Sequence, residues 1–76
     1  MPTVPIRKYA DLGAVMKAAR EGRGLTQEEL AESLGFGRDY LGSLESGKPG
    51  IFAARLFRTL TALGVKVTVS YEHRPR

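Results

Sequence analysis

The side chains that could bind or transform another molecule are concentrated in one stretch, LTQEELAESLGFGRDYLGSLESGK, from Leu25 to Lys48. It offers guanidinium, ammonium, amide and hydroxyl groups, which suit hydrogen bonds and ion pairs with an anion. Catalytic groups are scarce, because the chain has no cysteine and its one histidine is His73 near the C-terminal end. There is no phosphate-binding glycine motif or metal-ligand cluster in the sequence. We therefore predict a binding protein and not an enzyme, with no catalytic residue, cofactor or metal.

The composition of the chain also favours a small binding protein. The 76 residues carry a formal charge of +4 and the pI is near 9.9, which favours an anionic partner. A chain this short buries only about 60% of the surface that its unfolded form exposes, so we expect one domain helped by a partner subunit. The absence of cysteine, of a signal peptide and of a bilayer-spanning apolar run predicts a cytoplasmic protein.

Two short helices are predicted within the quoted stretch. Thr26 caps the first, with Glu29 at the reciprocal position of a capping box, and Gly35 supplies a left-handed stop. Leu30 and Leu34 are predicted to be its buried residues.

The second helix of the pair is expected from about residue 38 to residue 46, with Leu41 and Leu44 buried. Gly42 in its interior costs about 1 kcal/mol relative to alanine. Either close packing or the close approach of another molecule would explain it, and the sequence leaves both explanations open.

Further helices are expected on either side of this pair. One begins near Tyr9 and stops at Gly22 or Gly24. Another runs from about residue 52 to residue 63, and its predicted inward residues are Leu56, Leu60 and Leu63. Phe52 and Phe57 cannot both share that inward face, so an aromatic ring is expected near the surface as part of an interface.

The last segment has the period of a strand. Val65, Val67, Val69 and Tyr71 alternate with polar residues, which is typical of a half-buried strand. No second strand is evident in the sequence, and a lone strand leaves its backbone groups unpaired. We therefore predict a two-fold symmetric homodimer in which this strand pairs antiparallel with its copy, with Phe57 also at the interface. The alternative is that the valines pack only across their own helices.

Two helices joined by a tight turn with glycine form the helix-turn-helix arrangement, in which the second helix enters the major groove of DNA. The stretch also resembles the Cro and phage-repressor-like (XRE) regulators, in its LTQ-x-x-L-A opening, its glycine in the turn and its L-E-x-G-K close. The resemblance covers about residues 11–64. It implies an all-α, four-helix domain of the lambda-repressor-like type, here with a C-terminal strand in place of the usual fifth helix.

The segments DLGAVMKAAREGRGLTQ and RLFRTLTALGVKVTV, with the terminal strand, resemble the HipB-type antitoxins. These pair C-terminal strands across a dimer, repress their own operon and bind a HipA-type serine/threonine kinase toxin. The resemblance implies a repressor of a toxin–antitoxin operon that binds a palindromic operator. The alternative is a protein-interaction module for which DNA binding is secondary. The expected divisions are an extended segment (1–8), the helix-turn-helix domain (9–64), the dimerisation strand (65–71) and a flexible basic tail (72–76).

By position, the resemblance implies that base edges are read by Arg38, Asp39 and Ser43. Arg38 can pair with guanine, and Asp39 can accept from cytosine or orient Arg38. Asp39 can equally be only a helix-dipole residue. Tyr40 is expected either to touch a thymine methyl or a phosphate, or to be a partly buried ring.

The resemblance also implies phosphate contacts and one internal ion pair. Gln27, Ser46 and Lys48 match phosphate-contacting positions, although Gln27 can also be a simple surface residue. Arg20 and Glu45 match the internal ion pair of the family, and the alternative is an Arg20 that is free to contact DNA.

Overall fold

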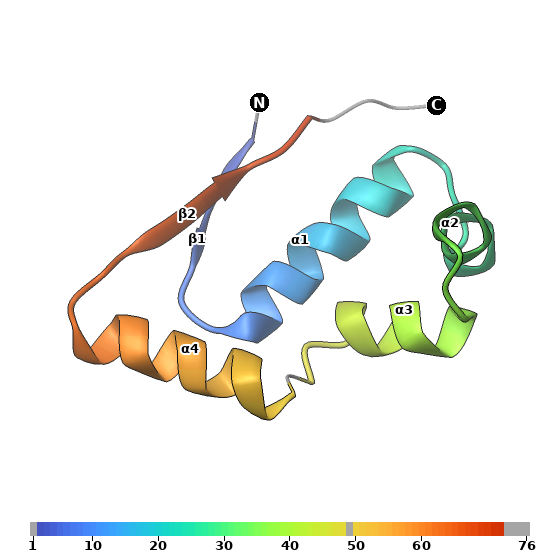
Figure 1. Ribbon diagram of the computed structural model, residues 1–76. Coiled ribbons are helices and arrows are strands. Elements are labelled where there is room, and N and C mark those ends of the chain that lie inside the picture. Colours follow the sequence, from blue (N-terminus) through green and yellow to red (C-terminus); the bar gives the residue numbers. More distant parts are fainter. Residues whose placement is uncertain (1, 49, 73–76) are drawn as a thin grey trace.

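The computed structural model describes residues 2–48 and 50–72. Within these ranges a two-stranded sheet lies beside a group of four helices (Figure 1). The sheet pairs a segment near the start of the chain with a segment near its end. In chain order the elements are β1 (Thr3–Ile6), α1 (Tyr9–Gly22), α2 (Gln27–Leu34), α3 (Arg38–Glu45), α4 (Ile51–Ala62) and β2 (Val67–Ser70). Pro49, expected in a turn, and positions 73–76 of the expected basic tail lie outside the described residues.

The C-terminal strand has a partner within its own chain. β2 pairs antiparallel with β1, so that Thr3 lies opposite Ser70 and Ile6 lies opposite Val67. The prediction that the strand has no partner in the chain was therefore wrong, and the fold is not purely helical. The segment TVPI gave no signal because four residues that include a proline are too few to show a strand pattern.

α1 lies very close to the C-terminal end of α3. A Cβ added at Gly13 would lie 2.9 Å from the carbonyl oxygen of Leu44 and 3.0 Å from that of Glu45. The Tyr9 hydroxyl donates to the same Leu44 carbonyl at 3.0 Å. Gly13 therefore allows α1 and α3 to approach closely. The buried apolar residues of the small core are Ile6, Val15, Ala31 and Leu41.

α2 begins and ends where the sequence predicted. The Thr26 hydroxyl accepts from the Glu29 amide at 3.0 Å, and a Glu29 carboxylate oxygen accepts from the Thr26 amide at 2.9 Å. Gly35 adopts a φ of 77° at the other end. Leu30 and Leu34 were both predicted to be buried. Leu30 is half-buried, whereas Leu34 is exposed, so the prediction was wrong for Leu34. Leu34 is in the last turn, where it borders an open groove and is not covered by another helix.

α4 has no buried residue, although its sequence is largely apolar. Its half-buried residues are Ala53, Ala54, Phe57 and Leu60, whereas Leu56 and Leu63 are exposed. The prediction that Leu56 and Leu63 face inward was wrong. Because apolar residues occur on more than one face of α4, periodicity alone cannot tell which face meets the rest of the domain.

Candidate nucleic-acid interface

A three-residue turn joins α2 to α3. Gly35 ends α2 in the left-handed conformation, and the Phe36 amide donates to the carbonyl of Ala31 at 2.9 Å. Gly37 then precedes α3 in an extended conformation. Because these backbone features fix the turn locally, they also fix the direction in which α3 leaves it. α3 buries Leu41 and exposes the opposite face.

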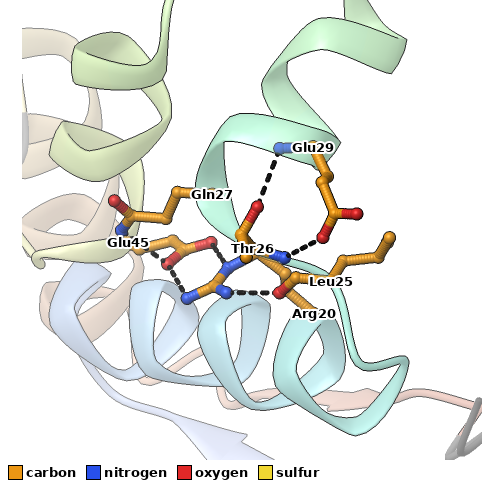
Figure 2. A network of polar contacts seen from close by, with 6 residues as sticks. All are labelled: Arg20, Leu25, Thr26, Gln27, Glu29 and Glu45. Carbon is orange, nitrogen blue, oxygen red and sulfur yellow. Dashed lines mark hydrogen bonds and ion pairs between the residues drawn. The ribbon is translucent and has the colours of Figure 1, made fainter.

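A buried ion pair holds α3 to α1. Arg20 Nε donates to Glu45 Oε2 at 2.7 Å, and Arg20 Nη2 donates to Glu45 Oε1 at 3.0 Å. Arg20 Nη1 donates to the carbonyl of Leu25 at 2.7 Å, just before α2 (Figure 2). The side chains of Arg20 and Glu45 are only 8% and 2% exposed. One guanidinium thus ties α1 to α3 and to the start of α2, with a planar geometry that lysine could not reproduce.

The pair is held in its charged form by these same contacts. The hydrogen bonds from Arg20 lower the pKa of Glu45 against the opposing effect of burial, and those to Glu45 raise the pKa of Arg20. Removal of either partner would leave a buried charge without compensation, which typically costs about 3–5 kcal/mol.

Gln27 extends this network to the first turn of α2. Its Nε2 donates to Glu45 Oε1 at 3.1 Å, so the amide is held against α3 (Figure 2). A Cβ added at Gly42 would lie 3.6 Å from Gln27 Oε1, which is an ordinary contact. Packing within the domain therefore does not require glycine at position 42.

The exposed side of α3 carries the residues predicted to read bases. Arg38, Asp39 and Ser43 are all exposed. Arg38 also lines an open groove of about 570 Å³ with the residues around the first turn of α2. This groove brings a cation beside the N-terminal end of α2, where the helix dipole also favours an anion.

The remaining predicted contact residues lie at the margins of this surface. Tyr40 is exposed, and its ring packs against Phe36 with centroids 5.2 Å apart and planes at 54°. The Ser46 hydroxyl donates to the carbonyl of Ser43 at 2.9 Å, so it must give up this bond to donate to another acceptor. Lys48 is exposed in the loop before α4. By helical periodicity Ser46 shares the face of Asp39 and Ser43, whereas Tyr40 lies to one side of it.

Three of the five residues predicted at a dimer interface lie between α4 and the sheet. Phe57, Val65 and Val67 line a cavity of about 480 Å³ that also borders Ile6 of β1. Val69 and Tyr71 are half-buried, in alternation with exposed residues of β2. Part of this apolar surface is therefore used inside the chain, and part of it borders open space.

Two groups of the site were not predicted from the sequence. The Leu25 carbonyl takes the third hydrogen bond of Arg20, and a backbone acceptor leaves no trace in a residue pattern. Phe36 supports Tyr40, and the spacing of four between two aromatic residues was the signal that could have revealed it.

Neither a metal site nor a membrane helix occurs in the part of the chain that the structure describes. No three histidine, cysteine, aspartate or glutamate side chains in those ranges are close enough together to hold a metal ion. No helix there is sufficiently long and apolar to cross a membrane.

Comparison with known proteins identifies similar chains. A family model described as a helix-turn-helix domain matches residues 11–69. The chain is 33% identical over 64 residues to the "Uncharacterized HTH-type transcriptional regulator y4mF" of Sinorhizobium fredii, with 84% of each chain covered. It is 39% identical over 54 residues to the "Uncharacterized HTH-type transcriptional regulator y4dJ" of the same organism, with 71% of this chain and 70% of that protein covered. No solved structure matches the chain significantly.

Proposed function

This chain belongs to the helix-turn-helix domain family, and from that premise we propose that it is a sequence-specific repressor that binds double-stranded DNA as a homodimer. Both relatives described above are named as transcriptional regulators, which supports a role in transcription regulation. The observation that carries the proposal is the anchoring of α3. Its last residue is locked to α1 through the Arg20–Glu45 pair, while its exposed face presents Arg38, Asp39 and Ser43 to solvent.

Residues on the exposed face of α3 read the bases. Arg38 reaches guanine O6 and N7 with two hydrogen bonds, and Asp39 either accepts from cytosine N4 or orients Arg38. Ser43 contacts a neighbouring base edge, and Tyr40 contacts a thymine methyl or a phosphate. Gly42 lies on the same helix with no packing partner that requires it, which favours the close approach of DNA as its explanation.

Phosphate contacts flank this surface. Gln27 uses one amide hydrogen for Glu45, and its second hydrogen is available to a phosphate oxygen. Lys48 contacts a phosphate from the loop that follows α3, and Ser46 contacts another when its hydroxyl hydrogen turns from the Ser43 carbonyl to a phosphate oxygen. These contacts set the register of the protein on the duplex without reading its sequence.

A second copy of the chain is expected to pair with β2 and not with β1. The Tyr71 amide donates to the Pro2 carbonyl, so the alternation of an antiparallel ladder turns the amides of Thr68 and Ser70 away from β1. The outer edge of β1 includes Pro5, which has no N–H to donate. A two-fold dimer formed at β2 therefore has a four-stranded sheet.

A two-fold axis through Val69 gives a favourable register. Lys66 then lies opposite the partner's Glu72, so that opposite charges face each other across the strands. On the inner face Val67 lies opposite the partner's Tyr71. Because Val67 borders the 480 Å³ cavity, that ring can fill space that one chain leaves open. Two copies then present two α3 helices to half-sites about one DNA turn, or 34–36 Å, apart.

The proposed biological role is that of a HipB-type antitoxin that represses its own operon and binds a HipA-type kinase toxin. This role is supported by the resemblance of α1, α4 and the terminal strand to those antitoxins, and it places the protein beside DNA in the cytoplasm. The alternative is a protein-interaction module whose DNA binding is secondary. The neighbouring reading frame distinguishes an antitoxin from a solitary regulator.

The proposal is tested by selecting bound duplexes from a random DNA library and measuring their affinity by mobility shift. Arg38→Ala should lose about 1–3 kcal/mol of binding to the selected sequence and relax specificity at one position. Lys48→Ala should weaken binding to all duplexes alike and reduce the log–log salt slope by about 0.9. Arg58→Ala, which removes the same charge from α4, is the matched control and should leave selected-site affinity nearly unchanged.

Failure to enrich any sequence would contradict the proposal. So would wild-type affinity in an Arg38→Ala variant that is folded.

A further inference from the structure

A cavity of about 480 Å³ lies between α4 and the end of the two-stranded sheet, and we call it the sheet–α4 cavity. Ile6 and Val67 line it from the sheet, and Phe57 and Leu60 line it from α4. Sites for small molecules typically have volumes of about 300–1,000 Å³ and are mostly apolar, with a few polar groups that orient the ligand. The size and the apolar lining of the sheet–α4 cavity therefore suit a small molecule.

Two cations lie at this cavity. Arg7 and Lys66 both line it, and no aspartate or glutamate of the described residues does. The register of the sheet pairs Ile6 with Val67, so Arg7 and Lys66 occupy opposite positions one step beyond that pair. Like charges directly opposite each other are destabilising. Neither side chain forms a hydrogen bond or ion pair within residues 2–48 and 50–72. An anion bound between them would remove the repulsion.

Positive charge continues beside the cavity. A groove of about 420 Å³ shares Arg7 and Phe57 with the cavity and is also lined by Lys8 and Arg58. The Asp11 carboxylate accepts from the backbone amides of Arg7 and Lys8 at 2.7 Å and 3.1 Å, so it offsets part of this charge. Asp11 lines neither the groove nor the cavity. Because the cations of the two spaces outnumber this one carboxylate, the local charge stays positive.

The apolar lining and the two cations together indicate which occupant fits. A neutral apolar molecule would fill the cavity but would leave Arg7 and Lys66 opposite each other without an anion. The phosphates of DNA would meet the cations but would bring no apolar group to the space between α4 and the sheet. Only a molecule that is apolar at one end and anionic at the other satisfies both parts of the lining.

We propose that the sheet–α4 cavity binds a small amphiphilic anion, with an apolar body and one carboxylate. The body lies against Phe57, Leu60 and Val67. The carboxylate lies between Arg7 and Lys66, and it accepts a charge-assisted hydrogen bond from each. This site is additional to the proposed DNA-contacting face of α3.

The ligand also acts on assembly, a consequence that rests on the proposed dimer. That dimer places the partner's Tyr71 opposite Val67 and the partner's Glu72 opposite Lys66. The second copy thus brings an aromatic ring and a carboxylate to the same lining residues, which is the chemistry proposed for the ligand. Because the two compete for one space, saturation with the ligand should favour single chains and release the operator.

The test titrates the full-length protein with decanoate, at concentrations below micelle formation, and follows the backbone amides by NMR. The shifts should be concentrated in β1, β2 and the C-terminal half of α4, and not in α3. Decanol has the same chain without the charge, and it should bind about tenfold more weakly, as expected for the loss of charge-assisted hydrogen bonds. Decylamine, which is a cation, should not bind. Added salt should weaken the binding of decanoate.

Variants separate the cavity from the dimer. Tyr71→Ala removes the competing ring and should bind decanoate more tightly than the wild type. In that background Arg7→Gln and Lys66→Gln should each weaken decanoate binding about tenfold and leave decanol binding unchanged. Arg55→Gln is the matched control, because it removes the same charge from α4 at a position that lines neither the cavity nor the cationic groove. Circular dichroism verifies that each variant is folded.

Binding and assembly are measured separately. Sedimentation should detect single chains in place of dimers when decanoate is added, and mobility shift should detect release of the selected duplex. Arg38→Ala should retain decanoate binding and lose DNA binding, so failure of the DNA proposal and failure of the ligand proposal give different results. The ligand proposal is overturned by absence of decanoate binding, by equal affinity for decanol, or by shifts centred on α3. Dimers that persist with decanoate bound would overturn the competition with the second copy.

Discussion

Two interior helical glycines should respond in opposite directions to the same substitution. In Gly13→Ala the new Cβ would lie 2.9 Å and 3.0 Å from the carbonyl oxygens of Leu44 and Glu45, and 3.2 Å from the Gly47 nitrogen. All three atoms belong to the backbone, so α1 must move away from α3. Overpacking of this kind costs about 1–3 kcal/mol, whereas the higher helix propensity of alanine returns about 1 kcal/mol. The net cost is about 0–2 kcal/mol, and because the new Cβ meets three backbone atoms we expect the upper half of this range, a free energy of unfolding lower by about 1–2 kcal/mol.

Gly42→Ala is the matched control. Its nearest neighbours would be the two amide atoms of Gln27, at 3.6 Å and 3.8 Å, which are ordinary contacts at the end of a flexible side chain. The gain in helix propensity then has no opposing cost, and we expect the free energy of unfolding to rise by about 0.5–1 kcal/mol.

Urea unfolding followed by far-ultraviolet circular dichroism measures both effects. All variants should be compared at one protein concentration, because a dimer gains stability with concentration. A total stability of about 4–11 kcal/mol, at about 0.05–0.15 kcal/mol per residue, leaves Gly13→Ala measurable. A Gly13→Ala variant as stable as the wild type, or a Gly42→Ala variant that is the less stable of the two, would contradict this expectation.

Further expectations concern binding, acid and assembly. Although more stable, Gly42→Ala should bind the selected duplex more weakly in a mobility-shift assay; equal affinity would exclude close approach there. Because the pKa of Glu45 is lower in the folded state than its value near 4.5 in the unfolded state, the ionised carboxylate stabilises the fold above pH 4.5. This contribution is lost as the pH falls through the folded-state pKa. Glu45→Gln should therefore reduce the loss of stability that urea titrations detect below about pH 4.5. Thr68→Pro removes an outward-facing amide but no β1–β2 bond, so sedimentation should detect monomers; persistent dimers would exclude pairing at β2.

The helix-turn-helix elements were the most predictable part of the molecule, because their signals are local. The capping box of Thr26 and Glu29 and the left-handed Gly35 are set by residues within a few positions of one another. The association of Arg20 with Glu45 is not local, and it was anticipated only through family resemblance.

The arrangement of α4 and the sheet was poorly predicted for physical reasons. Leu56 and Leu63 were wrongly predicted to face inward. α4 has apolar residues on more than one face, and which face is buried depends on the elements that pack against the helix. β1 was missed because Pro5 interrupts a very short strand whose pairing partner lies at the opposite end of the chain. Contacts between distant segments leave little trace in local periodicity.

The spacing of half-sites tests the central proposal most directly. A selected operator with two half-sites is compared in mobility-shift titrations with the same operator after insertion of about half a helical turn, or about five base pairs, between them. A rigid dimer that presents two α3 helices should bind the first duplex as two chains and bind the second with no more than the affinity of a single half-site. Equal affinity for both duplexes, or one chain bound per operator, would contradict the account.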